Sequence, residues 1–146
     1  MAIVDDMVCF SLYSATRATT RAYTELLAPW GLTYTQYLVL VVLWAEGAQT
    51  VQQLGELLQL DSGTLSPLVR RMEEKELLHR SRQQQDQRVV SISASQRTVE
   101  LRAELAHIPL AIAHGTGLPD LDSARDFIAT LQRLTLSMRE VTDAKG

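Results

Sequence analysis

Cys9 is the only cysteine among the 146 residues, so it is the only thiol available for nucleophilic or redox chemistry. A single cysteine cannot form a disulfide within the chain, and a zinc site of the usual kind would need more ligands. The three histidines are scattered along the sequence and are interpreted as ordinary surface or interface residues: His79, His107 and His114. We therefore expect neither a bound metal nor a cofactor.

Cys9 has two interpretations. A lone cysteine on a helix is usually a small buried hydrophobe. A reactive cysteine needs help to become a thiolate, and Cys9 lies within about one turn of the start of a helix predicted over residues 5–28, where unpaired N–H groups favour negative charge. Asp5 and Asp6 oppose this effect by like charge. Tyr13 lies four residues after Cys9 and shares its helix face.

A second set of residues has the chemistry of nucleic-acid binding. A short helix is predicted over residues 51–58 with Thr50 as its cap, followed by a tight turn and a helix from 62 to about 75 that Asp61 or Ser62 caps. The outer face of this second helix carries small hydroxyls, suited to phosphates and base edges, and two cations that could anchor the DNA backbone: Ser62, Thr64, Ser66, Arg70 and Arg71.

A β-hairpin is predicted directly after this helix pair. Residues 77–82 and 88–93 flank a polar run, and Val89, Val90 and Ile92 favour a strand. Arg88 is the candidate for the minor groove, where strong negative potential attracts arginine, and Asp86 could hold its orientation. The helix pair with its hairpin predicts a winged helix-turn-helix. The alternative is that the arginines are only a solvated surface.

Charge is distributed in a way that supports the DNA-binding interpretation, although the net charge is −3. Residues 61–102 contain 8 basic and 6 acidic side chains, whereas residues 1–60 contain 2 and 5, and residues 103–146 contain 4 and 6. The middle of the chain is therefore weakly positive between acidic flanks.

Long helices are predicted before and after the DNA-reading segment, residues 50–93, which we call the reading head. They cover residues 5–28, 33–46, 95–114 with an interruption at Pro109, and 121–142. The inward residues of the helix pair are predicted to be Leu54, Leu57, Leu65, Leu68, Val69 and Met72. Phe10 and Trp44 could form an apolar pocket near Cys9. The fold class is mainly α with a small β-hairpin, and no linker divides the chain.

The composition fits a globular protein, since 46% of the residues are apolar. No apolar run reaches the ~20 residues that span a bilayer. The start of the chain lacks the basic, then apolar, character of a secretory signal. We therefore expect a cytoplasmic protein without a membrane partner.

The stretch Leu60-Asp-Ser-Gly-Thr-Leu-Ser-Pro-Leu-Val-Arg-Arg-Met-Glu73, followed by Asp86-Gln-Arg88, resembles the MarR family of transcriptional regulators. The first half, with Cys9-Phe-Ser-Leu-Tyr13, Arg17, Tyr23 and Leu32-Thr-Tyr34-Thr-Gln-Tyr37-Leu, resembles the organic-hydroperoxide-sensing repressors of that family. The similarity extends from about residue 7 to residue 93. The run after the hairpin and the segment around His114 match least.

The resemblance implies one regulator domain over residues 1–146. Residues 1–30 and 95–146 would be dimerisation helices, and residues 33–93 would be the DNA-binding winged helix. A homodimer would bind an inverted-repeat operator in double-stranded DNA and repress a peroxide-detoxifying gene. The reactive cysteine would be Cys9, its hydroxyl partners Tyr23 and Tyr34 with Tyr13 nearby, and the wing salt bridge Asp86–Arg88.

Helix geometry constrains how such a sensor can work. Tyr23 follows Cys9 by fourteen residues, or ~21 Å along a straight helix. The two side chains can therefore meet only across a dimer with antiparallel first helices. Organic hydroperoxide would oxidise Cys9 to a sulfenic acid, which a low-molecular-weight thiol would trap or further peroxide would over-oxidise.

Three rival functions remain open at this stage. A regulator of the same fold could release DNA on binding a small phenolic or aromatic ligand, with Cys9 structural. A thiol peroxidase could use Cys9 as its nucleophile, although the chain has no resolving cysteine. A helical interaction protein would not bind DNA.

Overall fold

A computed structural model describes residues 3–82 and 88–144 of the chain. The chain forms two compact units, residues Met1–Ile108 and Pro109–Gly146. The boundary falls within the stretch predicted to supply the C-terminal dimerisation helices. Each unit is described by itself.

The first unit begins with a short 3-10 helix, Ile3–Asp6, and the long helix α1, Val8–Leu27. The helix starts later than the predicted residue 5, because Met7 is extended at φ −94° and ψ 118° and caps it without a side-chain hydrogen bond. A 3-10 turn, Ala28–Trp30, follows, and Gly31 adopts φ 63° to turn the chain toward α2, Tyr34–Glu46. Thr33 caps α2, in a reciprocal capping box with Gln36.

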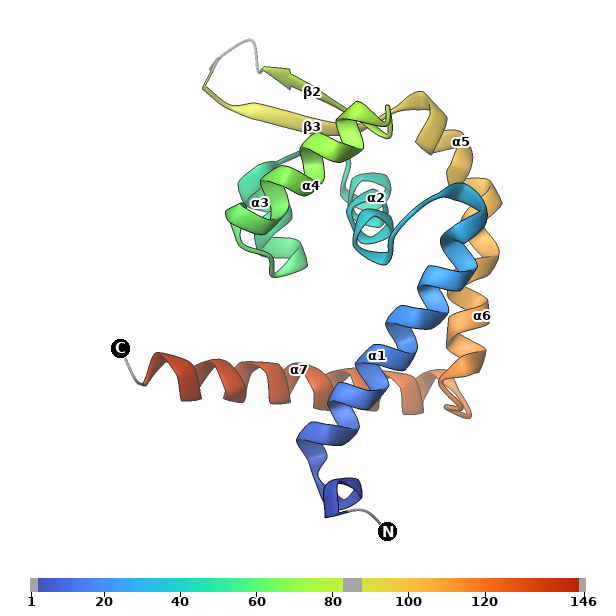
Figure 1. The fold of residues 1–146 in the computed structure, drawn as a ribbon, viewed down its shortest axis with the longest axis vertical. Helices are drawn as coiled ribbons and strands as arrows, with labels where there is room; N and C mark the ends of the chain where they lie inside the picture. Colours follow the sequence, from blue (N-terminus) through green and yellow to red (C-terminus); the bar gives the residue numbers. More distant parts are fainter. Residues whose placement is uncertain (1–2, 83–87, 145–146) are drawn as a thin grey trace. The chain divides into compact units, whose positions relative to one another are not determined.

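The helix pair predicted from the sequence is confirmed. Helix α3 spans Val51–Leu58, and the Thr50 hydroxyl caps it in a second capping box with Gln53. Helix α4 spans Ser62–Glu74, with the Asp61 carboxylate as its cap. The two helices pack against each other, and α4 runs beside the hairpin strands (Figure 1).

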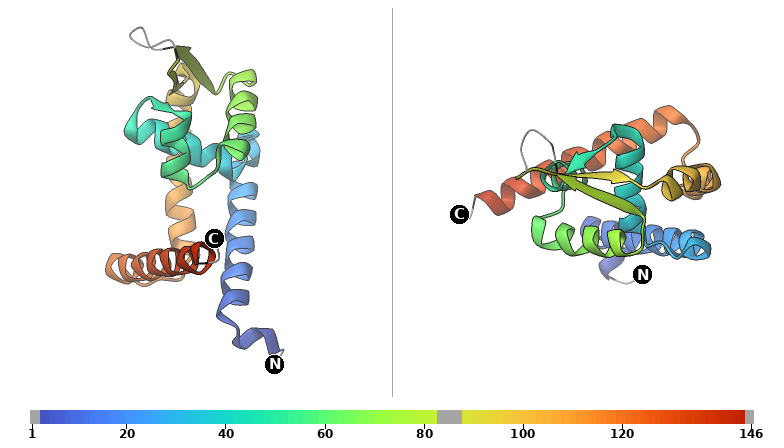
Figure 2. Two further views of the ribbon diagram at one scale, coloured as in Figure 1. Left: turned by 90° about the vertical axis from the view of Figure 1, so that its left-hand side faces the viewer. Right: turned by 90° about the horizontal axis from the view of Figure 1, so that it is seen from above.

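A three-stranded antiparallel sheet completes this winged helix, with strand order β1-β3-β2. The hairpin consists of β2, Leu78–Arg82, and β3, Val90–Ala94, paired so that Arg80 lies opposite Ile92. Strand β1, Gln49–Thr50, pairs with the far side of β3 and was missed from the sequence, because two residues carry no alternating pattern. Two further views show β3 leading directly into the next helix (Figure 2).

That next segment is broken earlier than predicted. Helix α5, Gln96–Glu104, ends in the 3-10 turn Leu105–His107, and α6, Ile108–Gly115, follows. The interruption therefore precedes Pro109, which is the second residue of α6, where a helix needs no N–H group. The Trp30 indole donates to Glu104 Oε2 at 2.8 Å and ties the end of α5 to the turn after α1.

Large apolar side chains, most of them leucines, form the core of the first unit. Fully buried side chains come from α1, α2, α3, α4, β2, β3 and the turn after α5: Leu27, Leu40, Leu54, Leu65, Met72, Leu78, Ile92 and Leu105. The predicted inward residues of α4 are confirmed. Leu57 is not inward, since it is 52% exposed. The buried face of α3 follows residues 51, 54, 55 and 58, and position 57 falls outside that stripe.

The second unit contains the end of α6 and the long helix α7, Leu121–Asp143, capped by Asp120. Several large apolar side chains of α7 are exposed in the single chain: Phe127, Ile128, Leu136, Met138 and Val141. Leu131 and Leu134 are half-buried.

Candidate nucleic-acid interface and the cysteine of α1

The outer face of α4 carries the polar residues predicted to approach DNA. Ser62, Ser66 and Arg70 recur every four residues and lie along one exposed stripe. The opposite face is held in the core by Leu65 and Met72. A helix anchored along one side and polar along the other can present these side chains to a major groove without moving its core.

Thr64, which is predicted to approach DNA, also takes part in the cap of α4. Its N–H donates to Asp61 Oδ1 at 2.8 Å, and its hydroxyl donates to Asp61 Oδ2 at 3.0 Å. These hydrogen bonds hold the pKa of the Asp61 carboxyl below its ordinary value. The hydroxyl proton is therefore engaged within the cap, and only the oxygen of Thr64 remains to meet another group.

The arginines of α4 are both exposed, as predicted. Arg70 lies 3.9 Å from Glu74 in an i,i+4 ion pair. Such an exposed pair is weak, so a phosphate can compete for the guanidinium. Arg71 lies beside it along the helix and faces solvent.

The wing supplies Arg88, which is exposed two residues before β3. Asp86, its predicted partner, lies outside the described residues. The Asp86–Arg88 salt bridge therefore stays a prediction.

The turn between α3 and α4 depends on Gly55, which the sequence reasoning missed. Its carbonyl accepts from Leu60 N at 2.9 Å, and Gln59 enters the left-handed region at φ 57°. A Cβ on Gly55 would lie 2.8 Å from the Leu60 carbonyl oxygen. The available signal was a glycine inside a helical pattern, which often marks close backbone packing.

Cys9 is the second residue of α1 and is exposed in the single chain. It therefore lies in the first turn, where helix N–H groups have no partner within the helix. The interpretation of Cys9 as a small buried hydrophobe is wrong for one chain, because the thiol is not part of the core.

The three tyrosines predicted to serve Cys9 lie in two different places. Tyr13 is 58% exposed, and the Arg17 guanidinium lies 5.5 Å from its ring centroid. Tyr23 stacks on Tyr34, with ring centroids 4.0 Å apart and planes inclined by 18°. Tyr37 lies 5.8 Å from the Tyr23 ring.

Burial shapes the acid–base behaviour of this aromatic cluster. Desolvation raises the pKa of Tyr23, Tyr34 and Tyr37 above the ordinary value of 10.0. Their hydroxyls are therefore neutral near pH 7, and each can donate a hydrogen bond to an anion.

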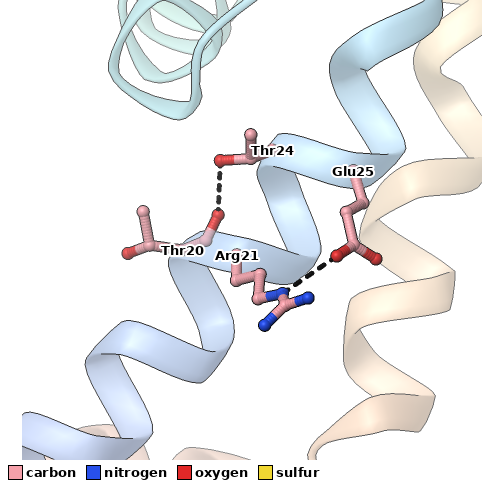
Figure 3. A network of polar contacts seen from close by, with 4 residues as sticks. All are labelled: Thr20, Arg21, Thr24 and Glu25. Atoms are coloured by element: carbon pink, nitrogen blue, oxygen red, sulfur yellow. Dashed lines mark hydrogen bonds and ion pairs between the residues drawn. The ribbon is translucent and has the colours of Figure 1, made fainter.

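One chain does not bring Cys9 to this cluster. Cys9 and Tyr23 lie fourteen residues apart on the same continuous helix, which places them ~21 Å apart along its axis. The helix surface around Tyr23 is polar. Arg21 donates to Glu25 at 3.0 Å, and the Thr24 hydroxyl donates to the Thr20 carbonyl at 2.9 Å (Figure 3).

Within one chain Phe10 and Trp44 do not form the predicted pocket, for the same reason. The Trp44 ring lies edge-on to Tyr37 at 6.3 Å, and so belongs to the aromatic cluster. Phe10 lies thirteen residues before Tyr23, or ~20 Å along α1, too far to pack against Trp44 within one chain.

Residues 3–82 and 88–144 contain no group of three or more side chains placed to hold a metal ion. No single helix within those ranges has the length and apolar character to cross a membrane. The bent pair Val8–Trp30 and Tyr34–Glu46 passes that test only as a pair, at 76° to each other.

Comparison with known proteins identifies the architecture. The MarR family matches residues 32–90, which contain the helix pair and most of the wing. The chain is 39% identical over 143 residues to the HTH-type transcriptional regulator TtmR of Methylorubrum extorquens, covering 98% of this chain and 71% of that protein. This chain belongs to the MarR family. It is therefore a transcription regulator that binds DNA through a winged helix, and not an enzyme.

Two further relatives sharpen this assignment. An organic hydroperoxide resistance transcriptional regulator of Bacillus subtilis is 39% identical over 126 residues, covering 83% of this chain and 86% of that protein. The structure of reduced AbfR, a Staphylococcus epidermidis protein, bound to DNA is similar at a TM-score of 0.75 and 31% identity, covering 92% and 94% of the two chains. The predicted fold class is confirmed, and the structure of reduced AbfR shows a protein of this fold bound to DNA.

Proposed function

We propose that this MarR-family regulator is a homodimeric repressor that releases its operator when organic hydroperoxide oxidises Cys9. The observation that carries the proposal is the location of Cys9, exposed in the first turn of α1. The similarity of this chain to an organic hydroperoxide resistance regulator supports the same oxidation chemistry.

The oxidation step balances without any other cofactor. The Cys9 thiolate attacks the terminal oxygen of ROOH, an S–O bond forms, and the O–O bond breaks. The alkoxide leaving group takes a proton and departs as an alcohol, while Cys9 becomes a sulfenic acid. A low-molecular-weight thiol then condenses with the sulfenic acid, forming a mixed disulfide and releasing water.

The partner subunit supplies the tyrosine hydroxyls in this proposal. Because Tyr23 lies ~21 Å from Cys9 along α1, its hydroxyl reaches a thiolate only if the α1 helices of two protomers run antiparallel. Apolar side chains exposed near the start of α1 support burial of this face against a second copy: Met7, Val8 and Phe10.

DNA release follows from the spacing of the two winged helices in the dimer. The recognition helices of a dimer must match half-sites about one helical turn apart. Oxidised Cys9 is larger and more polar than a thiol, and it changes the contacts at the centre of the dimer. A change in the angle between protomers separates the α4 helices and lowers affinity for both half-sites together.

The decisive experiment compares DNA binding by wild type and Cys9→Ser, with and without cumene hydroperoxide and a low-molecular-weight thiol. We expect peroxide to release wild type and to leave the variant bound. A variant that still dissociates on peroxide treatment would exclude Cys9 as the sensor. The test should be run at fixed salt, since phosphate contacts make affinity salt-dependent.

Two further measurements test the chemistry and the dimer. Mass spectrometry of peroxide-treated protein should show a mixed disulfide or higher oxide at Cys9, whereas a Cys9–Cys9 disulfide as the main product would contradict the proposal. Tyr23→Phe should slow the peroxide response. An unchanged response would remove Tyr23 from the mechanism.

Release by a small phenolic or aromatic ligand is the alternative function. The same Cys9→Ser protein separates the two, because a ligand-released regulator would respond to the ligand without needing the thiol.

A further inference from the structure

We propose that Glu73 and Arg80 are positioning residues for DNA binding, because their ion pair fixes the wing hairpin relative to the recognition helix. Glu73 is in the last turn of α4, and Arg80 is the central residue of β2. Arg80 Nε lies 2.8 Å from Glu73 Oε2, so the contact is a hydrogen-bonded ion pair between the two elements that must enter adjacent grooves.

Two observations distinguish the Glu73–Arg80 pair from an ordinary surface ion pair: its lower exposure and the direction of the Arg80 side chain. The side chains of Arg80 and Glu73 are 40% and 38% exposed, whereas the i,i+4 pair Arg21–Glu25 is 83% and 68% exposed. Arg80 lies on the same face of β2 as the buried Leu78, since alternate residues of a strand point to one side. The guanidinium is therefore directed toward α4 rather than along the free face of the wing.

The turn that leads from α4 into β2 is also held by hydrogen bonds from α5. The Thr98 hydroxyl of α5 donates to the Leu77 carbonyl at 3.0 Å, and Arg97 donates to the Lys75 carbonyl at 3.4 Å. These bonds fix the turn between α4 and β2 at its start. Strand β2 is also paired along its length with β3, which pairs on its other side with β1. Those contacts hold the strands to one another, whereas Arg80, two residues beyond Leu78, provides a second fixed point between β2 and α4.

A second fixed point on β2 also sets the position of β3. Arg80 is paired with Ile92 in the antiparallel ladder, so the two strands move as one hairpin. The wing extends two further residues along β2 before the part of the chain that leads to Arg88. A small rotation at Arg80 is therefore amplified at the end of the wing that is expected to meet the minor groove.

The pair makes a prediction whose sign differs from that of simple charge effects. Removing the negative charge of Glu73 would strengthen DNA binding if only attraction to phosphates mattered. If Arg80 itself bound a phosphate, Arg80→Gln would weaken DNA binding and reduce the salt slope of the affinity. Glu73→Gln would then strengthen DNA binding. A positioning pair instead predicts that both single variants weaken binding and change the salt slope by the same amount.

The experiment uses full-length protein and a duplex selected from a random library by the wild type. Glu73→Gln and Arg80→Gln should each lower affinity roughly fivefold per half-site. The exchanged variant Glu73→Arg with Arg80→Glu restores the pair at unchanged net charge and should recover most of the affinity. Glu25→Gln, which breaks the exposed 3.0 Å pair on α1, is the matched control and should not reproduce the loss.

Footprinting adds a readout that a general loss of stability would not produce. Glu73→Gln should weaken hydroxyl-radical protection of the minor groove while dimethyl sulfate protection in the major groove persists. Equal or tighter binding by Glu73→Gln, or no recovery in the exchanged variant, would overturn the proposal. If the glutamine variants do not fold, Arg80→Met keeps an aliphatic stem without the charge, and wild-type affinity in that variant would equally overturn it.

Discussion

Replacing Gly55 by alanine tests the geometry of the turn that joins α3 to α4. The new Cβ would lie 2.8 Å from the carbonyl oxygen of Leu60, and ordinary contact begins near 3.4 Å. The two atoms must therefore separate by about 0.6 Å, the difference between those values. The oxygen belongs to backbone that is fixed, because Leu60 N donates to Gly55 O at 2.9 Å and Asp61 begins the cap of α4.

The magnitude follows from two opposing terms. Overpacking costs about 1–3 kcal/mol, and a rigid backbone neighbour favours the upper part of that range. Alanine gains about 1 kcal/mol over glycine in helix propensity. We expect a net loss of about 1–2 kcal/mol in the free energy of unfolding, together with weaker DNA binding as α4 shifts against α3.

Gly115→Ala, at the end of α6, is the control. A Cβ added there would meet no atom within 4 Å. The stability of this variant should stay within about 0.5 kcal/mol of wild type. Urea unfolding followed by circular dichroism at one fixed protomer concentration measures both variants. A Gly55→Ala protein as stable as wild type would refute the reasoning about the turn.

Three other predictions follow from burial and from the shifted pKa values. Leu54→Ala should lower the free energy of unfolding by about 2–5 kcal/mol in the same urea assay, because Leu54 is fully buried. Tyr23, Tyr34 and Tyr37 should titrate above pH 10.0 by ultraviolet absorbance; their stabilising effect is complete below pH 10.0 and is lost as the pH rises through their raised pKa values. Asp61 should show a pKa below 3.8 by NMR; its contribution to stability is present above pH 3.8 and is lost as the pH falls through the lowered pKa, and Asp61→Asn should remove that dependence.

Local chemistry explains why much of the reading head could be predicted. Thr50 and Asp61 are strong helix caps, and the apolar residues of α4 recur at helical spacing, so both helices of the pair have nearly the predicted bounds. The β-branched run near Ile92 likewise predicts β3. These signals depend on neighbours within a few residues, which is the range over which sequence patterns act.

Contacts between distant residues were beyond that range. The Trp30–Glu104 hydrogen bond joins residues 74 positions apart, and β1 exists only because β3 pairs with it. The break at Leu105–His107 precedes the proline that predicted it. Leu57 has the residue type of a core position but lies outside the buried stripe of α3.

The sequence by itself determined the family, the helix caps, the polar outer face of α4, and the fact that Cys9 and Tyr23 are too far apart to meet on one helix. Only the tertiary structure decided that the Trp30 indole donates to Glu104, that Tyr23 stacks on Tyr34, and that Glu73 holds Arg80. The physical reason is that propensity and periodicity are summed along the chain. The orientation of a side chain toward a partner is set instead by how separate elements pack.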